Sequence, residues 1–165
     1  RRRIEIELGR DLIVSYKRVR YNNESFPDYV MCEEGNIYNK KTGKMLKPHY
    51  RAKGGNNPSY PNIGLMCDIA VEHPDGYYLM VRKCRTIMVH IAVCDTYNRD
   101  KMPVPDGVTE KEWKRTPASV KKQMRFSFQV NHKDHDQHNH HPSNLEYTTA
   151  KQNQAAYQEH RKKVA

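Results

Sequence analysis

Residues 130–153 read VNHKDHDQHNHHPSNLEYTTAKQN, and five of the chain's nine histidines fall within ten positions of this run. The alternation of apolar and polar residues from Phe126 to Val130 predicts a strand that carries Asn131 and His132 at its end. A polar loop follows, and a second short strand begins at Leu145. A capping box then starts at Thr149 and predicts a helix directly after it. The order predicted for this stretch is therefore strand, loop, strand, helix.

That order brings a small set of polar side chains together. Asn153, in the first turn of the helix, is expected to face back towards His132. Asn144, at the start of the second strand, is placed to fix the tautomer and orientation of the His132 imidazole. A neutral imidazole takes a proton from water near pH 7, and amide and phosphate oxygens suit Mg²⁺. The trio therefore predicts metal-assisted hydrolysis of a phosphodiester.

The same run resembles the HNH motif of the ββα-metal nucleases, in the form found in phage and intron-encoded homing endonucleases. The resemblance implies His132 as the general base and Asn144 as the residue that orients it. It also implies Asn131 and Asn153 as ligands of one Mg²⁺ or Mn²⁺ ion per active site. Asn131 stands where many relatives have Asp, which removes a negative charge from the metal site. His135 stands where the family usually has Gly.

Two upstream stretches add to the resemblance. Residues 29–48, YVMCEEGNIYNKKTGKMLKP, place two apolar runs beside polar turns, which predicts a small antiparallel ribbon. They are similar to the DNA-recognition ribbon that precedes HNH units in this family. Residues 89–97, VHIAVCDTY, have a helical spacing and are similar to a helix of the same enzymes.

Basic residues on the ribbon and in the loop after it are candidate contacts to double-stranded DNA. The candidates are Lys40, Lys41, Lys44 and Lys47 on the ribbon and Arg51 and Lys53 in the loop. For the ribbon, the alternative is an ordinary solvated strand edge protected by lysine. For Arg51 and Lys53, the alternative is an ordinary solvated loop.

The remaining sequence predicts a chain of the α+β class. Residues 4–19 alternate around Gly9 as two short strands, and residues 64–71 and 76–89 predict two more around a turn at 73–76. A short helix around Trp113 is expected within a basic connector. We predict an antiparallel β-ribbon DNA-binding region with a short helix over 1–98, a connector over 99–125 and a ββα-metal (HNH) catalytic unit over 126–165.

The composition points to a polyanionic partner. The 29 Lys and Arg exceed the 19 Asp and Glu and give a net charge of +10, and such a basic chain gains affinity by releasing counterions from phosphates. A basic surface that only maintains solubility is the alternative. No apolar run is long enough to span a membrane, and the first residues are too polar for a signal peptide. We expect a soluble, cytoplasmic protein, of the bacterial host cell if it is phage-encoded, that acts as a monomer or dimer on DNA without a small-molecule cofactor.

Other metal chemistry is also open from the sequence. The four cysteines show no close pair of the kind that opens a zinc finger, so reduced, packed thiols are expected. A dispersed zinc site at Cys84, His90 and Cys94 is the alternative, and a packed core histidine is the simpler interpretation of His90. The other loop histidines lack a thiol partner in their segment, and Asp134 and Asp136 are interpreted as turn residues.

These observations predict a DNA endonuclease of the HNH homing type, which nicks or cuts both strands. The alternative is a catalytically weak or inactive HNH-fold protein that only binds nucleic acid. A zinc-stabilised structural module is a third possibility.

Overall fold

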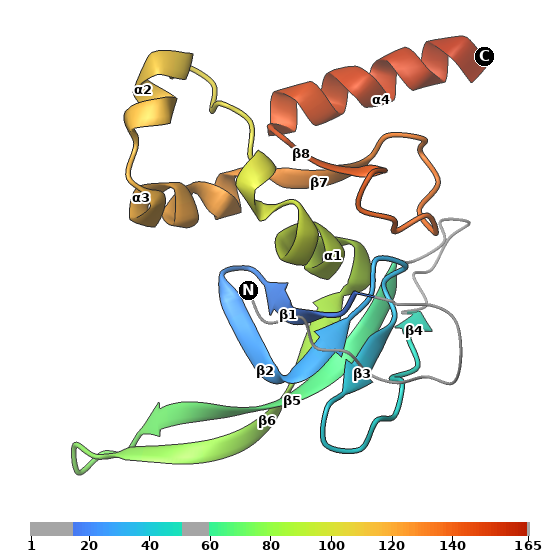
Figure 1. Cartoon of the computed structure of the whole chain (residues 1–165). Coiled ribbons are helices and arrows are strands. Elements are labelled where there is room, and N and C mark those ends of the chain that lie inside the picture. Colours follow the sequence, from blue (N-terminus) through green and yellow to red (C-terminus); the bar gives the residue numbers. More distant parts are fainter. Residues whose placement is uncertain (1–14, 51–59, 165) are drawn as a thin grey trace.

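The computed structural model describes residues 15–50 and 60–164 of the chain (Figure 1). Its strands are β1 (Lys17–Tyr21), β2 (Glu24–Met31), β3 (Ile37–Asn39), β4 (His49–Tyr50), β5 (Pro61–Glu72), β6 (Tyr78–Met88), β7 (Gln129–His132) and β8 (Leu145–Thr148). Its α-helices are α1 (Val89–Tyr97), α2 (Glu110–Arg115), α3 (Ala118–Gln123) and α4 (Ala150–Val164). Short 3₁₀ turns cover Arg99–Lys101 and Met124–Ser127.

The strands form three antiparallel sheets in the described part of the chain, with orders β1-β2-β3, β4-β5-β6 and β7-β8. The α+β class predicted from the sequence is confirmed. The hairpins β2–β3 and β5–β6, the helix α1 and the strand–loop–strand–helix order at the end of the chain also form as predicted. Most of the predicted strand pair over 4–19 lies outside the described residues.

One hydrophobic core holds the sheets together around α1. Val93 of α1 is fully buried, and the same cluster contains Val19 of β1, Ile63 of β5 and Leu145 of β8. Figure 1 shows α1 between the N-terminal sheets and the β7–β8 pair. Residues on both sides of the predicted connector therefore share a core, and the division into three parts stays a prediction.

A buried polar network also crosses this region. Asp95 of α1 is fully buried and accepts hydrogen bonds from the Arg125 guanidinium and from the Tyr147 hydroxyl, the latter at 2.6 Å. It also accepts one from the backbone N–H of Asn22 at 2.7 Å. Buried charges persist when they are paired and hydrogen-bonded in this way. Asp95 thus joins the N-terminal sheet, the connector and β8.

The β5–β6 hairpin projects from the body of the molecule (Figure 1). Its far end carries exposed apolar side chains such as Tyr78 and Met80, 66% and 68% exposed. No helix in the described residues is long and apolar enough to span a membrane.

Candidate active site

The C-terminal unit is built on the pair β7–β8, in which Asn131 lies opposite Glu146 and His132 opposite Leu145. β7 begins at Gln129, so the strand predicted from residue 126 begins later than expected. The reason is the buried Arg125, whose Nη1 donates to the Phe128 carbonyl at 3.1 Å and holds the preceding residues in a 3₁₀ turn.

Helix α4 begins at the predicted capping box. The Thr149 N–H donates to Gln152 Oε1 at 3.0 Å, and the Gln152 N–H donates to Thr149 Oγ1 at 3.3 Å. This reciprocal pair satisfies two N–H groups at the start of the helix. It fixes the direction in which α4 leaves β8, and so the place of Asn153 relative to β7.

The loop between β7 and β8 is held by short polar side chains. Asp134 Oδ1 accepts from the Asp136 N–H at 2.9 Å, as expected of a turn residue. His135 has φ +61°, the left-handed conformation in which Gly carries no penalty.

Asn144 closes this loop instead of orienting His132. Its side chain accepts from the Asp134 N–H at 3.1 Å and donates to Asp134 Oδ1 at 2.8 Å and to the Asn139 carbonyl at 2.9 Å. These bonds use the amide oxygen and both amide hydrogens. No hydrogen bond joins the Asn144 side chain to the His132 imidazole, so the direct contact expected between them is absent.

His132 is buried, with 5% of its surface exposed, and lies at the end of β7. Its Nε2 is buried and has no hydrogen-bond partner within the described part of the chain. Burial lowers the pKa of His132 from its usual value, while Asp134 and Asp136 act in the opposite direction. The ring is therefore held in the neutral form that a general base requires near pH 7.

Asn131, His132 and Asn153 line one cleft of about 670 Å³, together with Gln129, Tyr60 and Tyr157 among others. The Asn131 amide nitrogen donates to Glu146 Oε1 at 3.2 Å, and the Asn153 amide nitrogen donates to Gln129 Oε1 at 2.7 Å. Both predicted ligands thus keep their amide oxygens as acceptors, and Glu146 places a carboxylate beside Asn131. Gln129 and Glu146 were not predicted; their same-face register with Asn131 is the signal that could have found them.

The donor set suits a hard cation such as Mg²⁺, which binds oxygen ligands and keeps several waters. The negative charge of this donor set is low, because the two residues predicted to bind the metal are neutral amides. Across residues 15–50 and 60–164, no three His, Cys, Asp or Glu side chains are grouped so that they could hold a metal ion. The alternative zinc site at Cys84, His90 and Cys94 is therefore not formed, and the four cysteines are free.

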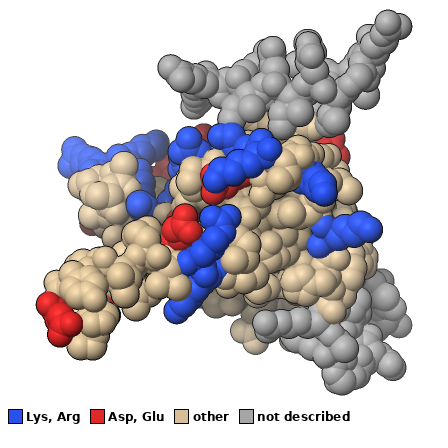
Figure 2. Space-filling model, turned by 90° about the horizontal axis from the view of Figure 1, so that it is seen from below, with Lys and Arg blue, Asp and Glu red and all other residues tan. Residues whose placement is uncertain are grey.

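Four of the predicted DNA contacts lie on one segment. Lys40, Lys41, Lys44 and Lys47 are exposed at and after the end of β3. Figure 2 shows basic side chains spread over the face seen there, whereas the projecting end of the β5–β6 hairpin shows acidic ones. Arg51 and Lys53 lie outside the described residues.

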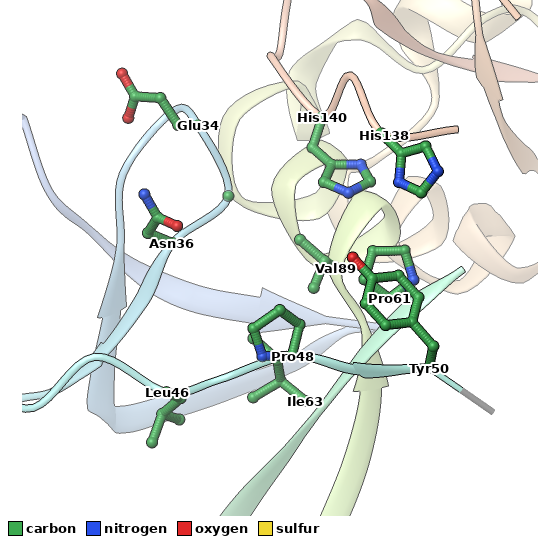
Figure 3. Close-up of a pocket in the computed structure, with 11 residues that line it drawn as sticks. Glu34, Asn36, Leu46, Pro48, Tyr50, Pro61, Ile63, Val89, His138 and His140 are labelled. Carbon is green, nitrogen blue, oxygen red and sulfur yellow. The ribbon is translucent and has the colours of Figure 1, made fainter. Parts of the chain in front are cut away.

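A smaller hollow of about 180 Å³ lies on the other side of the histidine loop (Figure 3). His138 and His140 reach into it from the loop, opposite Tyr50 of β4. Burial lowers the pKa of His140 to about 4. His140 therefore packs between the loop and the N-terminal sheets as a neutral side chain.

The comparisons with known proteins leave the family open. No protein-family model matches the chain, and no curated protein matches it by sequence. A solved structure described as "DNA binding and cleavage by the HNH homing endonuclease I-HmuI" is similar, with a TM-score of 0.47 and 22% identity. The match covers 80% of this chain and 52% of the solved chain. This chain therefore spans about half the length of the solved one. A likeness at this level identifies neither family nor activity.

Proposed function

We propose that this protein is a DNA endonuclease of the HNH homing type. The observation that carries the proposal is the placement of Asn131, His132 and Asn153 on the walls of one cleft. These residues come from two elements, β7 and α4, and only the fold brings them together. An imidazole kept neutral beside two amide oxygens is a set of groups suited to hydrolysing a phosphodiester.

In the proposed reaction His132 takes the proton from a water molecule, whose oxygen attacks the phosphorus of the DNA backbone. The bond between phosphorus and the leaving oxygen then breaks. Asn131 and Asn153 would hold Mg²⁺ or Mn²⁺ through their amide oxygens, and the bound ion supplies positive charge against the charge that develops on the phosphate. Glu146 would keep the Asn131 amide turned so that its oxygen faces the metal.

The basic residues supply the affinity for double-stranded DNA in this account. A net charge of +10 and the exposed lysines after β3 favour contact with phosphates. The described part of the chain forms one such cleft, so a monomer would nick one strand and a double-strand break would need a second copy.

The test of this proposal is incubation of the purified protein with a random-sequence supercoiled plasmid library and with phage genomic DNA. We expect cleavage in Mg²⁺ or Mn²⁺, with mapped ends at a restricted set of sites, and none in EDTA. Equal cleavage in EDTA would exclude the metal-dependent mechanism.

A DNA- or RNA-binding protein without cleavage activity is the second candidate. It is favoured by the two neutral amides at the predicted metal positions, which bind a divalent cation more weakly than carboxylates do. Saturable binding of DNA or RNA with no cut product after prolonged incubation in Mn²⁺ would favour this candidate over the nuclease.

A further inference from the structure

The His132 ring is oriented by something other than a hydrogen bond from Asn144. The Asn144 amide forms its hydrogen bonds with Asp134 and Asn139, and His132 Nε2 has no partner within residues 15–50 and 60–164. An imidazole without such a bond turns about its side-chain torsions unless its neighbours prevent it. A general base must hold its nitrogen within hydrogen-bond reach of the water that it activates.

Three rings surround His132 in the described structure. Tyr60 lies nearly parallel to it, with 6.0 Å between the ring centroids and 14° between the planes. The ring centroid of His90 on α1 lies 5.2 Å from that of His132, and the ring centroid of His140 in the loop lies 5.8 Å from it. Tyr60 also packs on His90 at 4.4 Å, so Tyr60, His90 and His132 form a closed cluster of three rings.

The members of this cluster differ in exposure. His90 and His132 are each 5% exposed, whereas Tyr60 is 36% exposed and lines the cleft. Tyr60 therefore contacts both imidazoles and also lines the cleft in which DNA would bind. Its contacts with both histidines are ring contacts, so a phenylalanine at position 60 would keep them.

We propose that Tyr60 is a positioning residue, which together with His90 fixes the plane of the His132 imidazole at the edge of the cleft. The proposal rests on the proposed nuclease function for its effect on rate, and on the ring geometry for its effect on His132 itself. An aromatic contact of this kind corresponds to a rate effect of up to roughly tenfold when it controls the reacting group.

The experiment compares Tyr60→Leu, Tyr60→Phe and wild type in the full chain. Single-turnover cleavage of a mapped site gives the rate at saturating protein, and binding of the same DNA in EDTA gives Kd. We expect Tyr60→Leu to lower the saturated rate roughly tenfold, with Kd changed less than roughly twofold, and Tyr60→Phe to restore the rate. A weaker Kd with an unchanged rate would make Tyr60 a DNA contact and overturn the proposal.

NMR of the His132 imidazole in the free protein gives a readout that needs no cleavage. Tyr60→Leu should move the His132 ring signals, assigned with a His132→Gln spectrum, and Tyr60→Phe should return them close to wild type. Tyr157→Leu is the matched control, because Tyr157 lines the same cleft while the ring contacts of His132 in the described residues are with Tyr60, His90 and His140. Unchanged His132 signals in Tyr60→Leu would overturn the proposal. Absence of cutting by wild type would instead count against the nuclease function alone.

Discussion

At the scale of single residues, the histidines of this chain are separated by their surroundings. His132 and His90 are buried and neutral, whereas His138 is exposed on the loop. The resemblance to the HNH motif implied His132 as the base, and the sequence favoured a packed role for His90. It did not reveal that the two rings touch, because their contact joins α1 to β7, which lie far apart in the sequence.

Acid should destabilise the fold through His90. Burial lowers the pKa of this side chain to about 3, below its value of about 6.5 in the unfolded chain. The unfolded chain therefore binds the proton first, so stability is complete above pH 6.5 and is lost as the pH falls towards 3. We expect His90 to remove roughly 2 kcal/mol from the free energy of unfolding between pH 6.5 and pH 5.

Urea unfolding at several pH values measures this effect. The slope of stability against pH should be smaller in His90→Phe, which keeps a ring at position 90 without a titrating group. An identical slope in wild type and His90→Phe would show that His90 does not cause this loss of stability in acid.

At the scale of elements, hairpins and caps followed the sequence closely, and departures have local causes. The capping box at Thr149 begins α4 as predicted because its hydrogen bonds depend only on neighbouring residues. The predicted start of β7 was wrong because Arg125 turns inward to Asp95. Asp95 lies on α1, and the local alternation of residues does not reveal this partner. The direct contact predicted between Asn144 and His132 is absent for a similar reason, since the fold of the loop decides where the Asn144 amide points.

The turn between β2 and β3 is the point where the N-terminal sheet meets α1 and the histidine loop. Gly35 has φ +85°, and a Cβ there would lie 3.0 Å from Val89 Cγ1 and 3.4 Å from His140 Cβ. We expect Gly35→Ala to lower the free energy of unfolding by about 2 to 4 kcal/mol, from backbone strain and crowding together.

Gly43 provides the matched control. It has φ +65°, and a Cβ there would meet nothing within 4 Å. Gly43→Ala should therefore lower the free energy of unfolding only by the cost of the backbone strain, about 1 kcal/mol. Equal losses in the two variants, measured by urea unfolding, would show that the contact of Gly35 with α1 is unimportant.

At the scale of the whole molecule, α1 joins the proposed DNA-binding sheets to the cleft. Asp95 carries the polar part of this connection through Arg125, Tyr147 and the Asn22 backbone. Sequence patterns do not reveal this connection, because the side-chain partners of Asp95 lie 30 and 52 positions away along the chain. The α+β class and the order of elements could be predicted, whereas the packing between distant segments could not.

Breaking this connection should destabilise the whole fold. Asp95→Asn leaves the Arg125 guanidinium buried without its counter-charge, and we expect a loss of about 3 to 5 kcal/mol. Asp68→Asn is the control, because its ion pair with Arg82, at 3.5 Å, is half exposed and should be worth less than about 1 kcal/mol. Similar losses in the two variants would contradict the structural role of Asp95.

We propose that His132, one of five histidines between residues 132 and 141, performs the chemistry. The most direct measurement is the single-turnover rate of DNA cleavage in Mg²⁺ by His132→Ala, with His138→Ala as the control and circular dichroism to verify folding. The account predicts a rate lower by roughly 100-fold to 10,000-fold for His132→Ala and a rate near wild type for His138→Ala. Undiminished cutting by folded His132→Ala would contradict it.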